Sequence, residues 1–189
     1  MVEVEKAAFS IEPMVKLNDT LFNWNNVSTN QSLQGIDNLN QASVIPNVNW
    51  QFSNVKFTTE ITAIGEANKN SKLLVRYSFK NQSAIPKDIE LYLLIRPYQV
   101  NPYYQFLNTI GGVGKINEIK EIDQNTIGVD NKIIYSQQNH NLFTASTFDE
   151  GNIIDFIRNN SITYNKQAFD PAGLANGIVR YNLHIKPIS

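Results

Sequence analysis

Alternation of apolar and polar residues runs through most of this chain and restricts it to β-structure. Every second residue is apolar over most of "VKFTTEITAIG" (55–65) and "GIVRYNLHIKP" (177–187). A period of two places successive side chains on opposite faces of a strand, whereas a helix repeats every 3.6 residues. Turn-forming Asn, Asp, Gly and Pro separate these short stretches. The pattern predicts an all-β protein built as a two-layer antiparallel β-sandwich.

Several segments can be assigned more closely. "SKLLVRYSFK" (71–80) and "DIELYLLIRPY" (88–98), joined by "NQSAIPK", are predicted to form an antiparallel hairpin. The four short stretches between residues 115 and 147 are predicted to form a β-meander. "FDEGNIIDFIRNN" predicts a short helix near 152–158, with acidic Asp149 and Glu150 at its positive end. No repeat or linker interrupts the chain, so residues 1–189 are predicted to form a single domain.

Composition argues against several partners. The chain has 16 Lys and Arg against 17 Asp and Glu, a net charge of −1, with the basic residues scattered singly. We therefore expect no nucleic acid or anionic membrane as a partner. The apolar runs are far shorter than the roughly 20 residues of a membrane span, and the first residues do not resemble a signal peptide. With no cysteine, disulfides and thiolate sites are excluded.

No cofactor or metal site is predicted. "GGVGK" (111–115) lacks the spacing of a phosphate-binding loop, so its glycines are interpreted as turn or close-packing residues. His140 and His184 lie in different elements, and zinc needs at least three convergent ligands. "DQNTIGVD" (123–130) departs from the EF-hand order and is interpreted as a turn between strands. Calcium binding at irregular loops is left open.

A glycosidase would need two carboxyl groups facing each other about 5 to 10 Å apart. The sequence offers seven candidates but cannot pair them: Glu60, Glu66, Glu90, Asp149, Glu150, Asp155 and Asp170. Asp149 and Glu150 are explained by the start of the short helix, and Asp170 with Pro171 by a turn. No catalytic residue is predicted.

One loop is a candidate binding region. "LYLLIRPYQVNPYYQFLNTIGGVGKI" (91–116) begins as a buried strand and continues as a polar loop in which prolines hold aromatic rings. Sugars stack on such rings while amides bind their hydroxyl groups. Alternatively, the rings close one end of the sandwich or contact a neighbouring domain. The carbohydrate or domain-interface candidates are Tyr98, Asn101, Tyr103, Tyr104, Gln105, Phe106 and Asn108.

The order of motifs resembles a known type of domain. "NWNNVSTNQSL", "IPNVNWQFSNVKFTTEITAIGE", "RPYQVNPYYQFLN" and "DPAGLANGIVRYNLHIKP" are similar to a β-sandwich segment of large multidomain bacterial proteins. Those proteins look like glycosidases with a six-hairpin (α/α) toroid, and some carry discoidin-type (F5/8 type C) modules. The resemblance covers the chain from about Phe9 to Pro187 and implies a supersandwich like that of galactose mutarotases. In the resembled segment, Pro-Trp is expected where this chain has Tyr103 and Tyr104.

The resemblance implies a context and no catalytic residue, because the general acid and base of such enzymes belong to the toroid. It implies a non-catalytic accessory domain beside a catalytic domain of the same polypeptide, with carbohydrate as a further partner, in the periplasm or at the cell surface. An autonomous carbohydrate-binding module is the alternative. A mutarotase-type epimerase would need a histidine and a carboxylate in one cleft.

Overall fold

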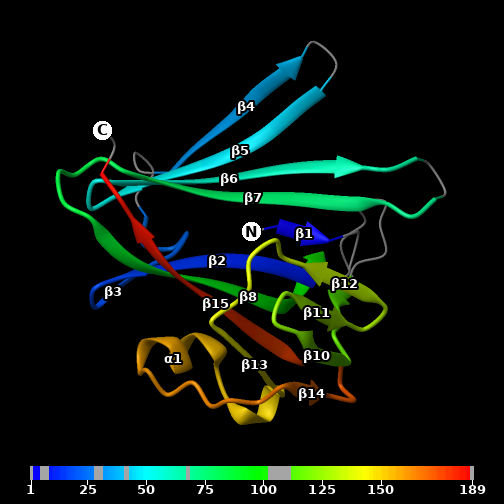
Figure 1. Ribbon diagram of the computed structural model, residues 1–189. Coiled ribbons are helices and arrows are strands. Elements are labelled where there is room, and N and C mark those ends of the chain that lie inside the picture. The colour runs from blue at the N-terminus through cyan, green and yellow to red at the C-terminus, as the bar shows by residue number, and fades with distance from the viewer. Residues whose placement is uncertain are drawn as a thin grey trace. The chain divides into compact units, whose positions relative to one another are not determined.

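The computed structural model describes residues 2–4, 9–27, 32–40, 43–66, 69–101 and 112–187 (Figure 1). Antiparallel strands dominate these residues, with one 3-10 turn and one short helix, so the all-β, sandwich-like fold is confirmed. The chain divides into two compact units, residues 1–16 with 90–182 and residues 17–89 with 183–189. The prediction of a single domain stays a prediction. None of the described helices is long and apolar enough to cross a membrane.

The first unit contains two antiparallel sheets. The larger has the order β1-β2-β8-β15-β13, with β9 paired to β8, and the smaller has the order β12-β11-β10-β14. Their bounds are β1 (Val2–Val4), β2 (Phe9–Leu17), β8 (Lys87–Asn101), β9 (Gly112–Gly114), β10 (Glu118–Asp123), β11 (Thr126–Val129), β12 (Lys132–Tyr135), β13 (Leu142–Ser146), β14 (Gln167–Phe169) and β15 (Asn176–Ile185). Strands β2, β8 and β15 each extend into residues of the second unit.

The two sheets of the first unit pack face to face. Ile119 on β10, Phe143 on β13 and Val179 on β15 are buried, and Phe143 is opposite Val179. At Gly177 on β15 the two layers come so close that an added Cβ would overlap Ile119 Cδ1 of the smaller sheet. The apolar side chains of both inner faces thus form one core, as period-two patterning requires.

Gly177→Ala is expected to lower the free energy of unfolding by about 1–2 kcal/mol, because overpacking forces the buried Ile119 from its position. Ile119→Val removes the overlapping methyl group, so the double variant should recover part of that loss, as a denaturation double-mutant cycle would show. Gly128→Ala is the matched control, since its nearest added contact is an ordinary 3.5 Å. Additive effects of Gly177→Ala and Ile119→Val would contradict this packing.

The β-meander is confirmed for three strands and wrong for the fourth. Strands β10, β11 and β12 are consecutive antiparallel neighbours, whereas β13 pairs with β15 in the larger sheet, with Thr144 opposite Ile178. The chain changes sheet through residues 136–141. His140 N donates to Gln124 O, in the turn before β11, and Asn141 N donates to Arg180 O on β15, so the last two residues of this connection are fixed to different sheets.

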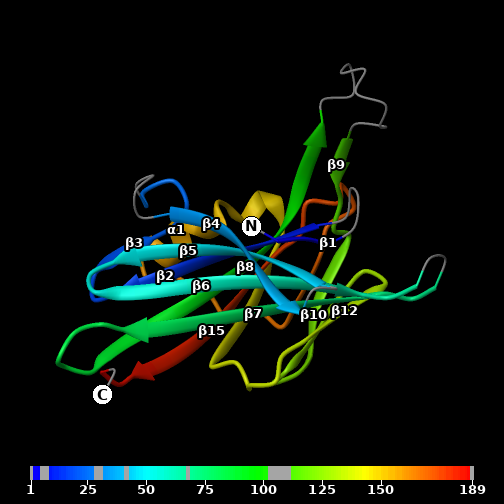
Figure 2. The same ribbon diagram turned by 90° about the horizontal axis from the view of Figure 1, so that it is seen from above.

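The second unit is built on one antiparallel sheet with the order β4-β5-β6-β7. Its strands are β4 (Ser32–Asn40), β5 (Ser43–Phe52), β6 (Val55–Ile64) and β7 (Lys72–Asn81), and the short β3 (Thr20–Phe22) pairs with β2. Strands β6 and β7 run side by side in both views (Figure 2). Phe57 stacks on Phe79 at 4.7 Å and lies 5.3 Å from Trp50, so the buried rings of β5 and β6 pack on the same side of this sheet.

The predicted hairpin of residues 71–80 with 88–98 is wrong. Strand β7 pairs with β6, whereas β8 pairs with β2, with Ile95 opposite Ile11. The buried side chain of Asn81 explains the separation. Its Nδ2 donates to Ile85 O at 2.8 Å and to Ile185 O at 3.1 Å. The connection is therefore held by a side chain and by the C-terminal segment, instead of closing as a hairpin ladder.

The short helix is confirmed as α1 (Ile153–Arg158), preceded by the 3-10 turn η1 (Phe148–Glu150). The interpretation of the acidic residues was wrong, because Asp149 and Glu150 belong to η1. Glu150 Oε2 accepts a hydrogen bond from Thr147 N at 2.6 Å, and α1 is capped instead by the side chain of Asn152. A short polar side chain outside the helix thus replaces the expected acidic start.

Candidate functional site

The predicted aromatic loop lies mostly outside the described residues. Strand β8 continues to Asn101, three residues further than predicted, and its end pairs with β9. The glycines of β9 thus belong to a strand: Tyr98 is opposite Gly114, and Asn101 is opposite Gly112. For Tyr98 and Asn101 the structure describes the backbone and not the side chains, and Tyr103, Tyr104, Gln105, Phe106 and Asn108 are not described. Their binding role stays a prediction.

The candidate carboxylates are used in local interactions. Glu60 pairs with Arg76, Glu66 with Lys69, Glu90 with Arg180 and Asp155 with Arg158. Asp170 is buried in the predicted turn, where Oδ1 accepts from Ala172 N and Oδ2 from Phe148 N. Glu150 caps η1, and Asp149 is exposed within it. None of these interactions joins two of the seven carboxylates.

The two histidines differ in their surroundings. His184 is exposed, and its Nδ1 lies 2.7 Å from Asp88 Oδ1. His140 is buried, and its Nε2 lies 2.7 Å from Glu121 Oε1. Sequence reasoning missed this pair because 19 residues separate its members. The one available signal was the register of β10, where Glu121 shares the inward face with Ile119 two residues earlier.

Glu121, His140 and Lys166 form a cluster inside the first unit. The side chains of Glu121 and His140 are only 8% and 3% exposed, and Lys166 Nζ lies 3.0 Å from Glu121 Oε2. Burial alone would raise the pKa of Glu121, but hydrogen bonds from Lys166 and His140 outweigh it and lower that pKa. An ionised carboxylate only accepts hydrogen bonds, so His140 donates from Nε2.

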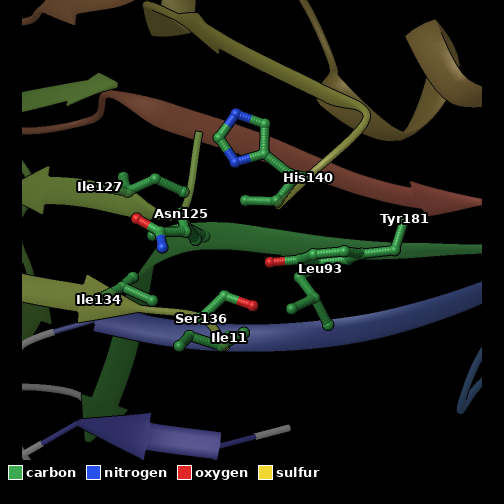
Figure 3. Close-up of a pocket in the computed structure, with 10 residues that line it drawn as sticks. Ile11, Leu93, Asn125, Ile127, Ile134, Ser136, His140 and Tyr181 are labelled. Carbon is green, nitrogen blue, oxygen red and sulfur yellow. The ribbon is translucent and has the colours of Figure 1, made fainter. Parts of the chain in front are cut away.

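A small pocket lies beside this cluster, between the two sheets of the first unit (Figure 3). Its volume is about 20 Å³, and its walls are Ile11, Leu93, Ile95, Asn125, Ile127, Ile134, Ser136, His140, Val179 and Tyr181. Burial raises the pKa of Tyr181, and a hydrogen bond with Ser136 opposes this. His140 and Glu121 are thus the adjacent histidine and carboxylate that a mutarotase-type epimerase would need. The space suits about one water molecule and is too small for a sugar ring.

The described residues contain no group of three or more metal-ligating side chains that could hold an ion. The segment 123–130 is confirmed as a turn followed by β11. Asp123 Oδ1 accepts from Asn125 N at 2.9 Å, and Asp130 Oδ1 accepts from Glu118 N at the same distance. Both carboxylates therefore organise the backbone of the smaller sheet.

The outer surface of the smaller sheet carries an exposed apolar face. We define this outer apolar face as Ile122, Ile133, Tyr135 and Phe169, and these residues are 52% to 67% exposed. Gly128 lies directly opposite Ile133, and a Cβ added at Gly128 would lie 3.5 Å from Ile122 Cδ1. Because Gly128 has no side chain, the surface between the exposed Ile122 and Ile133 is not covered at that position.

Neighbouring registers place the aromatic members on the same surface. Phe169 is opposite Glu118, and Tyr135 is opposite Thr126. Lys120 Nζ lies 3.1 Å from Glu118 Oε1 and supplies a paired charge within this surface. The outer apolar face therefore draws its side chains from β10, β12 and β14, and the Lys120–Glu118 pair lies within it.

Comparison with known proteins adds no family assignment: the scan against protein-family models finds no match, and no curated protein matches the chain. The resemblance to a segment of toroid glycosidases stays a prediction.

Proposed function

We propose that this chain is a non-catalytic accessory β-sandwich domain of a longer, glycoside hydrolase-like polypeptide acting in the periplasm or at the cell surface. The outer apolar face is its contact surface for a neighbouring catalytic domain. This face is the observation that carries the proposal, because large apolar side chains exposed together on one sheet surface mark interaction sites in soluble proteins. Its aromatic and aliphatic composition, with charge held in a pair, matches the centre of an interdomain interface.

The interior of the first unit supports a non-catalytic role. The histidine nearest a carboxylate faces a pocket of about 20 Å³, and the candidate glycosidase carboxylates are engaged in ion pairs, caps and turns. Chemistry on a sugar would need an open site with paired acid and base groups. The described residues offer surfaces for contact, and no such site.

Amide hydrogen exchange of the natural gene product, compared with the isolated chain, tests the proposal. We expect slower exchange in β10 and β12 when the neighbouring domain is present, because an interface excludes water from that sheet. Strands β6 and β7 serve as an internal reference. A natural protein with no further domain, or unchanged exchange in β10 and β12, would refute the accessory role.

Charged substitutions on the outer apolar face provide a mutational test. Ile133→Lys and Tyr135→Lys, made together in the full-length protein, should abolish the exchange protection of β10 and lower catalytic activity severalfold. A lysine buried at an apolar interface must be desolvated. The matched control is Ile85→Lys, which places the same charge on an equally exposed isoleucine of the second unit. The isolated chain should keep its thermal stability in all variants.

Carbohydrate binding is the second candidate, favoured by the exposed rings of Tyr135 and Phe169 on one surface. Such rings stack on the apolar faces of sugars. Titration calorimetry of the isolated chain with a panel of soluble oligosaccharides separates the candidates. The accessory role predicts no heat of binding, whereas a binding module predicts binding that Tyr135→Ala or Phe169→Ala weakens at least tenfold.

A further inference from the structure

We infer that the free edge of β12 is an interaction surface for a second copy of this chain, which pairs with it strand to strand. This inference does not rest on the accessory role. Strand β12 ends the order β12-β11-β10-β14, and among the described residues its one strand partner is β11 (Figure 1). A strand with one neighbour presents unused backbone N–H and C=O groups on its other side, where a strand of another molecule can pair.

The hydrogen bonds between β11 and β12 show which groups face the free edge. Ser136 N donates to Asn125 O at 2.8 Å, so Ser136 directs its N–H toward the β11 side. Successive residues of a strand direct their backbone groups to opposite edges. Ile134, two residues before Ser136, therefore faces β11, whereas Ile133 and Tyr135 direct their N–H and C=O groups to the free edge. Each of these two residues thus offers a donor and an acceptor.

The side chains of these two residues do not protect the edge. Natural edge strands are usually protected by charged side chains, by proline or by a β-bulge. Ile133 and Tyr135 are instead an aliphatic and an aromatic residue, 62% and 66% exposed. The β11–β12 register runs without a bulge from Thr126 opposite Tyr135 to Val129 opposite Lys132. The regular backbone and the exposed side chains therefore both suit a strand partner.

A second copy of β12 is complementary to this edge. Antiparallel pairing centred on Ile134 places Ile133 of each molecule opposite Tyr135 of the other, as two-fold symmetry requires. These residues all face the shared edge, so each pair exchanges both of its N–H···O=C hydrogen bonds. An isoleucine opposite an aromatic ring is a favourable cross-strand pair. Lys132 falls opposite Ser136, so this register brings no like charges together.

Charge distinguishes this edge from the longer edge of the second unit. Strand β7 (Lys72–Asn81) ends the order β4-β5-β6-β7. Pairing of β7 with its own copy over residues 72–80 would place Lys72 opposite Lys80 and Arg76 opposite Arg76. Like charges directly opposite each other destabilise a strand pair. The side chains of β7 thus oppose self-pairing, whereas those of β12 favour it.

Sedimentation equilibrium of this chain over a wide range of concentrations tests the inference. We expect a monomer–dimer equilibrium. Ile133→Pro removes an edge-facing N–H from each molecule and keeps the hydrogen bonds to β11, so it should raise the dimer dissociation constant roughly tenfold or more. Ile122→Ser, on the outer apolar face but away from the edge, is the matched control and should leave that constant unchanged. Equal effects of both variants would show association through the face and overturn strand pairing.

Disulfide cross-linking gives a readout that does not need the proline variant to fold. The chain has no cysteine. Ile134→Cys places a thiol opposite its own copy, with the two Cα atoms about 4.5 Å apart, and should form a covalent dimer on mild oxidation. Lys132→Cys, the matched control, lies opposite Ser136 and should not. A monomer at every concentration, or equal cross-linking of the two cysteine variants, would overturn the inference and leave the exchange test of the accessory role unaffected.

Discussion

Arg96→Ala is expected to lower the free energy of unfolding by about 3–5 kcal/mol, the usual result of removing one partner of a buried ion pair. Arg96 on β8 donates to Glu12 Oε2 on β2. The side chain of Glu12 is only 2% exposed, whereas that of Arg96 is 30% exposed. Without the guanidinium, the carboxylate keeps its desolvation cost and loses its compensating charge. Urea denaturation monitored by circular dichroism measures the difference.

Two comparisons show whether the effect comes from the buried charge. In the double variant Glu12→Leu with Arg96→Leu no buried charge is left unpaired, so most of the lost stability should return. Arg76→Ala removes an arginine whose side chain is 71% exposed from its pair with Glu60 and should change stability little, because solvent screens its charge. If the double variant were as unstable as Arg96→Ala, lost packing of the long side chain would be the cause.

Glu121→Leu is expected to lower the free energy of unfolding by about 2–3 kcal/mol, in the upper part of the range for leaving a buried donor unsatisfied. His140 Nε2–H would lose its acceptor in a place from which water is largely excluded. Glu121→Gln keeps an acceptor oxygen and should cost clearly less. Glu118→Leu, three residues away on the outer surface of the same strand, is the matched control. Equal losses for Glu118→Leu and Glu121→Leu would show that strand propensity, not the buried hydrogen bond, determines the result.

The same carboxylate should make stability depend on pH in the acid range. The pKa of Glu121 is lower in the folded chain than its unfolded value of about 4.5, so the folded state favours the ionised form. Its contribution is therefore fully present above pH 4.5 and is lost as the pH falls through the lowered folded pKa. The stability difference between the natural chain and Glu121→Gln, measured by urea denaturation from pH 7 to pH 3, should shrink over that interval. A constant difference would contradict the lowered pKa.

Local pattern accounts for the elements that the sequence predicted correctly. The alternation over residues 55–63 corresponds to strand β6, in which Val55 and Phe57 are buried. The alternation over residues 178–185 corresponds to most of strand β15. The isoleucines after Asn152 form part of α1, and the Asp170 carboxylate accepts a hydrogen bond that stabilises the predicted turn. In each case the decisive interactions lie within a few residues along the chain.

The candidate site was less accessible to sequence reasoning. The predicted ring-bearing loop lies largely outside the described residues, whereas the Glu121–His140 pair and the outer apolar face were not anticipated. Both depend on register. The β10–β11 ladder is irregular between Glu121 and Asp123, and the outer apolar face combines residues up to 47 positions apart on β10, β12 and β14. A single sequence contains no record of such pairings.

The amino-acid sequence by itself determined that this protein consists of short antiparallel strands with one small helix, because side-chain alternation and turn residues act locally. The tertiary structure alone decided that β7 joins β6, that β13 crosses to β15, and that a histidine meets a carboxylate in the core. The physical reason is that every strand presents the same backbone donors and acceptors at its edges. Alternation shows which face is buried, but only the packing of the whole chain selects which edges pair.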